Sequence, residues 1–107
     1  MEVNNENIGQ QFYFIDQICS NDTAIIERGI LKSVLPKYRF NDSFGSSAYK
    51  REENILFSVL KSSGKEVAKV VTNNSLIFTK LSDAISYCRE ADIGVLFGYS
   101  VVAGEIA

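Results

Sequence analysis

Hydrophobic residues near the amino end of the chain recur at the spacing of an α-helix. Ile8, Phe12, Ile15 and Cys19 follow one another at intervals of three or four positions. An α-helix turns once in about 3.6 residues, so this spacing puts the four side chains on one face. The pattern predicts a first helix over residues 8–19.

A second apolar stripe follows a short polar break. Asn21 and Asp22 are good amino-terminal caps, residues 23–35 carry isoleucine and valine at helical spacing, and Pro36 ends the pattern. Proline lacks the backbone N–H that a helix interior needs. We expect a second helix over residues 23–35, and then a loop over residues 37–47, which are rich in residues that favour turns.

The middle of the chain predicts strands. Residues 48–61 fit either a helix or a strand, and we favour a strand over 54–61 because the valine-rich run over 66–72 needs a partner. The Ser-Ser-Gly sequence between these two runs suits a turn. The asparagines at 73–74 tolerate positive φ, so they predict a tight hairpin into residues 75–79.

The last part of the chain predicts one helix and one strand. Ser82 is a cap for a helix that runs to about Ala91, and Gly94 then leads into an apolar run over 95–102 that is long enough for a buried strand. The whole pattern predicts an α+β fold with two N-terminal helices, a small and mainly antiparallel sheet (a meander), one helix and a C-terminal strand.

The composition is that of one globular domain. The chain has 107 residues, of which 46% are hydrophobic and 22% are charged, and this is the usual size of a domain with one core. We therefore treat residues 1–107 as a single domain, with residues 1–7 loose. The start of the chain is acidic and rich in asparagine, unlike the basic start of a signal peptide, so we expect a cytoplasmic protein.

The residue types exclude several kinds of chemistry. The chain has no histidine, which removes Ser/His and Cys/His nucleophilic pairs. Its two cysteines, Cys19 and Cys88, lie beside apolar residues in predicted helices, so we interpret them as buried structural thiols. We find no set of residues that would hold a metal or a cofactor and no catalytic group, and the prediction is that the protein is not an enzyme.

The charges are unevenly distributed along the chain. Residues 1–27 carry five acidic and no basic side chains, residues 28–80 carry ten basic and four acidic ones, and residues 81–107 carry four acidic and one basic. These blocks either segregate on the surface and steer a charged partner, or mix in space when the ends fold back on the middle. The sequence favours mixing.

Because the sequence shows no catalytic group and no metal or cofactor site, the first hypothesis is that the chain binds another protein. We expect a stoichiometric inhibitor, an immunity protein or an antitoxin, acting on a toxin, a nuclease or a component of host defence. Acidic side chains on the third helix, at Asp83, Glu90 and Asp92, would then meet a cationic partner. The protein itself would be a monomer or a homodimer, since the valine-rich run could extend a sheet across two copies.

Two further hypotheses stay open. The basic middle of the chain interleaves cations with aromatic rings, a composition that suits nucleic acid; the residues are Lys37, Tyr38, Arg39, Tyr49, Lys50 and Arg51. Alternatively, the protein binds a small molecule in an apolar pocket lined by residues such as Tyr13, Tyr49 or Tyr99.

Overall fold

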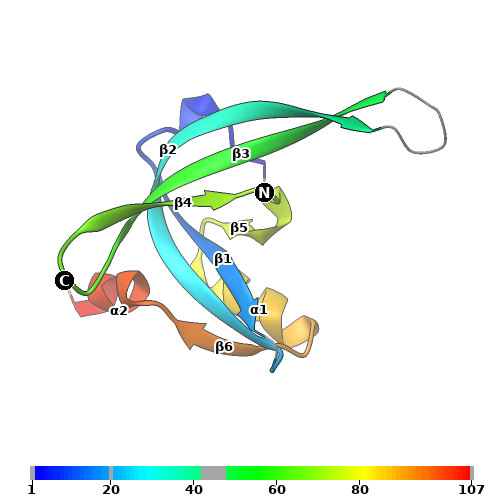
Figure 1. Cartoon of the computed structure of the whole chain (residues 1–107). Helices are drawn as coiled ribbons and strands as arrows, with labels where there is room; N and C mark the ends of the chain where they lie inside the picture. Colours follow the sequence, from blue (N-terminus) through cyan, green and yellow to red (C-terminus); the bar gives the residue numbers. More distant parts are fainter. Residues whose placement is uncertain (1, 20, 42–47, 107) are drawn as a thin grey trace.

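The protein is built on one curved, mainly antiparallel β-sheet (Figure 1). The computed structural model describes residues 2–19, 21–41 and 48–106, and for residues 17, 37–41, 48–52, 105 and 106 it describes the backbone. The sheet has six strands in the order β4-β3-β2-β1-β5, and β6 pairs with β2 off this path. The elements are β1 (Gln11–Cys19), β2 (Thr23–Asn41), β3 (Ala48–Leu60), β4 (Glu66–Val71), β5 (Ile77–Phe78), α1 (Leu81–Glu90), β6 (Gly94–Phe97) and α2 (Tyr99–Ile106), with two 3-10 turns, η1 (Asn5–Asn7) and η3 (Asn74–Leu76).

The long strand β2 organises the sheet. It spans 19 residues, about 60 Å of extended chain. On one edge it pairs with β1 as far as Ile30, and on the other it pairs with β6 through residues 23–26 and with β3 through residues 30–41. Its second half leaves the body with β3 as a two-stranded arm, which reaches to the upper right in Figure 1.

The prediction of two N-terminal helices is wrong, because residues 11–19 and 23–41 are the strands β1 and β2. Phe12 and Phe14 point into one apolar core, while Ile15 packs into a second core on the opposite face. A strand that is buried on both faces loses the polar-apolar alternation by which strands are recognised. Its continuous apolar run then resembles a helical stripe, and Cys19 accordingly lies in a strand.

Pro36 does not end an element, as the sequence suggested. It lies within β2 and pairs with Glu53 of β3. At this point β1 has already ended, so β2 has a sheet neighbour on one edge only. Proline is tolerated in a sheet at such positions, where no second strand needs its missing N–H.

The predicted strand over 54–61 is confirmed, and the hairpin that follows it is present. β3 pairs with β4 in antiparallel register from Ile55–Val71 to Leu60–Glu66. Gly64 has a φ of 83° in the connecting turn and donates its N–H to the carbonyl of Lys61 at 2.9 Å. Glycine adopts this left-handed conformation without strain.

The second hairpin, at Asn73 and Asn74, is not formed. Asn73 instead caps η3, where its side-chain oxygen accepts the Ser75 N–H at 3.0 Å. Asn74 accepts the backbone N–H of Val3 at 3.0 Å, and β5 then pairs with β1 rather than with β4. Both asparagines therefore use their side-chain amides and not a positive φ. The chain leaves β4 and crosses to the far edge of the sheet.

The carboxy-terminal part is one helix, a short strand and a second helix. The helix predicted over 82–91 is confirmed as α1, although it begins at Leu81, and Lys80 rather than Ser82 is its N-cap residue. The predicted strand over 95–102 is wrong beyond residue 97, because β6 ends at Phe97 and α2 begins at Tyr99. Here Gly98 lets the chain turn against β2, and Val101 reaches the core.

Apolar cores lie on both faces of the sheet. The first is inside its curve and is closed by Val3 of the N-terminal segment. The second lies between the sheet and α1 and includes Cys88. The curve is pronounced, since Lys69 of β4 bonds Asp16 of β1 at 3.4 Å although two strands separate them in the sheet.

Gly29, in the middle of β2, makes room for the aromatic centre of the first core. The rings of Phe14 and Phe57 stack beside it with centroids 4.7 Å apart. A Cβ atom at position 29 would lie 2.9 Å from the Phe57 Cβ and 3.2 Å from the Phe14 ring. Any larger residue would therefore push the two rings apart.

We predict that Gly29→Ala lowers the free energy of unfolding by about 1–3 kcal/mol, the usual cost of overpacking a core. Urea titration followed by circular dichroism measures this change. Ser63→Ala, in the exposed β3–β4 turn, is the control and should change stability by less than about 0.5 kcal/mol. An equal effect of the two substitutions would contradict the packing role of Gly29.

Candidate functional site

The acidic residues singled out in the sequence lie on α1 and directly after it, at the lower end of the molecule in Figure 1. Asp83 is in the first turn of α1, Glu90 is its last residue, and Asp92 follows it with a φ of 56°. All three side chains are exposed. Asp83 and Glu90 are two helical turns apart, so they share one face of α1.

The structure adds a fourth carboxylate to this end. Asp22, in the turn before β2, is exposed and has a φ of 55°. Its carbonyl accepts the N–H of Gly94 at 2.9 Å, which places it beside the start of β6. The sequence analysis treated Asp22 as a helix cap, and its place here depends on the pairing of β6 with β2.

Beside these acids lies an exposed apolar stretch that the sequence analysis missed. Leu96 and Phe97 of β6, and Tyr99 and Val102 of α2, leave between 42% and 56% of their surfaces exposed. The whole run was expected to be a buried strand, so exposure could not be anticipated. Of this run, Val95 and Val101 are the residues that pack in the second core.

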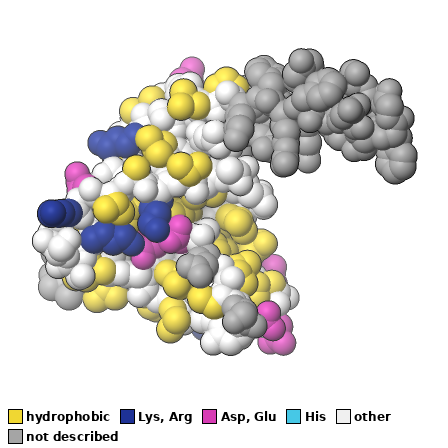
Figure 2. Space-filling view, viewed as in Figure 1, with side chains coloured by type: hydrophobic (Ala, Val, Ile, Leu, Met, Phe, Trp, Pro, Cys, Tyr) yellow, Lys and Arg dark blue, Asp and Glu magenta, His cyan; other side chains and the backbone are white. Residues whose placement is uncertain are grey.

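We call these eight residues the acidic-apolar end: Asp22, Asp83, Glu90, Asp92, Leu96, Phe97, Tyr99 and Val102. Hydrophobic side chains are visible along the lower part of the molecule, with acidic ones at its lower right (Figure 2). Exposed apolar side chains bordered by charged ones are typical of a protein interaction surface.

A buried carboxylate fixes α2 against β2. Glu27 is 4% exposed, and its Oε2 accepts the hydroxyl of Ser100 at 2.9 Å. The same hydroxyl oxygen accepts the backbone N–H of Arg28 at 2.8 Å, and Lys61 Nζ lies 4.0 Å from Glu27 Oε2. Gly98 leaves the space that this carboxylate fills, since a Cβ there would overlap its Oε1.

Ser100 therefore replaces a strand partner in the gap between β6 and β3. Its hydroxyl oxygen accepts a backbone N–H of β2, and its O–H donates to Glu27. The second hydrogen bond offsets part of the free-energy cost of burying that carboxylate. This contact holds the start of α2, and with it the exposed residues Tyr99 and Val102, in one position. The role of Ser100 is therefore structural: its hydrogen bonds position the α2 residues of the acidic-apolar end.

We predict that Ser100→Ala lowers the free energy of unfolding by about 1–3 kcal/mol, because it leaves the Arg28 N–H without its acceptor and removes a hydrogen bond from the buried carboxylate of Glu27. Hydrogen exchange at the Arg28 amide should become faster, which nuclear magnetic resonance measures directly. Ser86→Ala, at an exposed position of α1, is the matched control. Unchanged exchange at Arg28 would rule out the proposed link.

The basic and aromatic candidates fall on the arm formed by β2 and β3. The register pairs Tyr38 with Arg51 and Arg39 with Lys50, so the backbone brings the two halves of the sequence motif opposite one another. Lys37 and Tyr49 pair with their neighbours Glu52 and Phe40 in the same ladder. The side chains of these residues, and the intervening residues 42–47, lie outside the described part of the chain.

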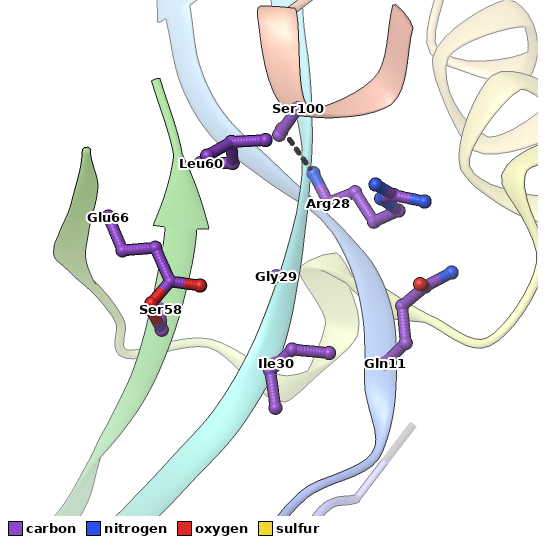
Figure 3. Close-up of a pocket in the computed structure, with 8 residues that line it drawn as sticks. All are labelled: Gln11, Arg28, Gly29, Ile30, Ser58, Leu60, Glu66 and Ser100. Carbon is purple, nitrogen blue, oxygen red and sulfur yellow. Dashed lines mark hydrogen bonds between the residues drawn. The ribbon is translucent and has the colours of Figure 1, made fainter. Parts of the chain in front are cut away.

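A shallow cavity of about 160 Å³ opens on the face of the sheet beside α2 (Figure 3). Its lining mixes polar and apolar surface and consists of Gln11, Arg28, Gly29, Ile30, Ser58, Leu60, Glu66 and Ser100. Ligand pockets usually enclose about 300 Å³ or more and are largely apolar. Tyr13 and Tyr99 do not line this cavity, and the side chain of Tyr49 lies outside the description, so the geometry adds no support to a small-molecule site.

Of the two cysteines that the sequence predicted to be buried, Cys88 is a core residue and Cys19 is not. Cys88 is buried in α1 and Cys19 is half-buried in β1, and both thiols are free. Burial raises the pKa of the Cys88 thiol, so it stays protonated and unreactive at neutral pH. Among residues 2–19, 21–41 and 48–106, no group of three His, Cys, Asp or Glu side chains is arranged to hold a metal ion.

Neither helix of the described chain is long and apolar enough to cross a lipid bilayer. Comparisons with protein-family profiles, characterised proteins and solved structures gave no match.

Proposed function

We propose that this protein is a cytoplasmic protein-binding module that acts as a stoichiometric inhibitor, in the manner of an immunity protein or antitoxin. It neutralises its partner by covering a surface of it. The observation that carries the proposal is the exposure of four large apolar side chains on the short segment of β6 and α2: Leu96, Phe97, Tyr99 and Val102. Burying apolar surface is a main driving force of protein association.

The charges at this end indicate the kind of partner. Asp22, Glu90 and Asp92 are exposed beside the apolar stretch, and opposite charges across an interface speed encounter and select the partner. A cationic protein such as a nuclease or a toxin fits this surface. The apolar residues supply affinity and the acidic residues supply specificity.

We expect Leu96→Asp and Phe97→Asp each to weaken partner binding by about tenfold or more, because a charge would be buried in the contact. A photo-crosslinking residue at position 96, expressed in the native host, identifies the partner. Calorimetry with the purified pair then measures the affinity. Asp92→Lys should slow association chiefly at low salt.

Val70→Asp is the matched control, because Val70 is an equally exposed valine on β4, outside the acidic-apolar end. It should leave binding unchanged. Loss of affinity in the control and in the two test variants alike would point to misfolding, and retained affinity in all of them would show that this end is not the interface.

A second candidate function is nucleic-acid binding by the arm. The observation that favours it is the paired register of Tyr38 with Arg51 and Arg39 with Lys50 on a two-stranded ribbon that leaves the body (Figure 1). Two-stranded ribbons enter the grooves of duplex DNA, where cations meet phosphates. The acidic character of the chain as a whole, with a net charge of −2, opposes such binding.

For this second candidate, the combined variant Lys37→Ala, Arg39→Ala, Lys50→Ala and Arg51→Ala should abolish retention on heparin at moderate salt. With a labelled DNA duplex, the slope of log K against log salt should fall by about 3 to 4, close to 0.9 for each lost phosphate contact. Fluorescence anisotropy over a range of salt concentrations measures this slope. Equal binding by the variant and the natural chain would eliminate the arm as a nucleic-acid site.

A further inference from the structure

The strand β6 exposes a sheet edge of a kind that folded proteins normally protect. β6 pairs with β2 on one side and has no sheet partner on the other, within the part of the chain that the structure describes. Unpaired edges recruit other strands, so most are very short, or carry charges or proline. The sequence Gly-Val-Leu-Phe of β6 has neither charge nor proline.

The two strands that end the main sheet path, β4 and β5, are protected. β4 carries Glu66 and Lys69, and Lys69 bonds Asp16 at 3.4 Å. β5 is only two residues long. Charges and short length thus disfavour strand addition at both ends of the main sheet path, whereas the open edge of β6 carries neither a charge nor a proline.

The backbone groups on the bare edge can be identified from the hydrogen bonds of β6. Gly94 donates its N–H to Asp22 and Gly98 donates its N–H to Ile26, each at 2.9 Å, so both face β2. Backbone groups alternate in direction along a strand. Val95 and Phe97 therefore direct their N–H and C=O groups away from β2, to the open side.

Exposed apolar side chains on both faces of β6 could pack against those of an added strand. Leu96 is 56% exposed and Phe97 is 47% exposed, and adjacent strand residues point to opposite faces. A new strand at this edge would find an apolar neighbour above and below the sheet. Cross-strand pairs of this kind stabilise a sheet.

We propose that β6 captures an extended segment of the partner as a seventh strand, and that this segment alternates apolar residues and ends in lysine or arginine. This inference rests on the proposed protein-binding function. The basic end follows from the acids at the amino end of β6, where Asp92 and Asp22 flank Gly94. An antiparallel segment, the slightly more stable arrangement, would bring its carboxy-terminal cation to these carboxylates.

The test uses the whole chain and a synthetic peptide of alternating threonine and valine that ends in two lysines. A peptide that ends in two glutamates is the control. Fluorescence anisotropy should show the lysine peptide binding at least about tenfold more tightly than the glutamate peptide, because charges of the same sign across the contact disfavour binding. Equal binding of the two peptides would overturn the assignment of the basic end.

Two substitutions at one position separate the backbone from the side chain. Phe97→Ala removes the ring and keeps the N–H, whereas Phe97→Pro removes both, and proline is tolerated where the N–H faces an open edge. Phe97→Pro should bind the lysine peptide about three- to tenfold more weakly than Phe97→Ala, the effect of one lost hydrogen bond. Equal affinities would overturn strand addition.

Hydrogen exchange in the natural chain tests the same contact without a substitution. Saturating lysine peptide should slow exchange at the Val95 and Phe97 amides, which face the open edge, while the Gly94 and Gly98 amides, which already bond β2, should change less. Unchanged exchange at Val95 and Phe97 would overturn the proposal even if Phe97→Pro failed to fold.

The outcomes also separate this inference from the proposed function. If Leu96→Asp abolishes binding of the natural partner while Phe97→Ala and Phe97→Pro bind equally, the protein-binding function stands and strand addition fails. Self-association of the chain that Phe97→Pro removes, seen by analytical ultracentrifugation, would assign the edge to a second copy and overturn the partner segment.

Discussion

The fold depends on keeping the backbone of β2 hydrogen-bonded along both edges between Thr23 and Val34, a stretch that no single neighbour covers. β1 covers the first half of one edge, and Asn5 continues it by bonding both the N–H and the carbonyl of Val34. On the other edge β6 and β3 leave a gap at Arg28, which the hydroxyl of Ser100 fills. A buried backbone N–H without a partner costs about 1–3 kcal/mol, so each of these contacts is needed.

This requirement explains why the acidic-apolar end lies where it does. Ser100 can reach β2 only if the chain turns at Gly98, and that turn ends β6 after four residues and begins α2. The turn leaves Leu96, Phe97 and Tyr99 on the outside while Val95 and Val101 fill the core. Closing the edge of β2 thus creates the apolar surface and the open edge beside it, and both belong to the same short segment.

The curved sheet also brings charges from different parts of the sequence together. Lys61 Nζ lies 4.0 Å from Glu27 Oε2, and Lys69 bonds Asp16 at 3.4 Å. Two bases of the middle block therefore lie beside acids of the first block, which is the mixing that the sequence favoured. Asp22, Asp83, Glu90 and Asp92 stay exposed.

Residue types and short-range patterns were enough to determine some features of this protein. The lack of histidine excludes several catalytic arrangements, Ser-Ser-Gly marks the β3–β4 turn, and the stripe over 81–90 gives α1, because each depends on neighbours in the chain. Tertiary structure alone decided the rest. Phe12 and Ile15 are buried on opposite faces of β1, so their spacing imitates a helix, and the exposure of Leu96 depends on Ser100 bonding a strand 72 residues away. A strand that is buried on two faces lacks the alternation of polar and apolar residues that marks a strand, and long-range pairing leaves no pattern in neighbouring residues. The order of the sheet and its open edge therefore could not be predicted from the sequence.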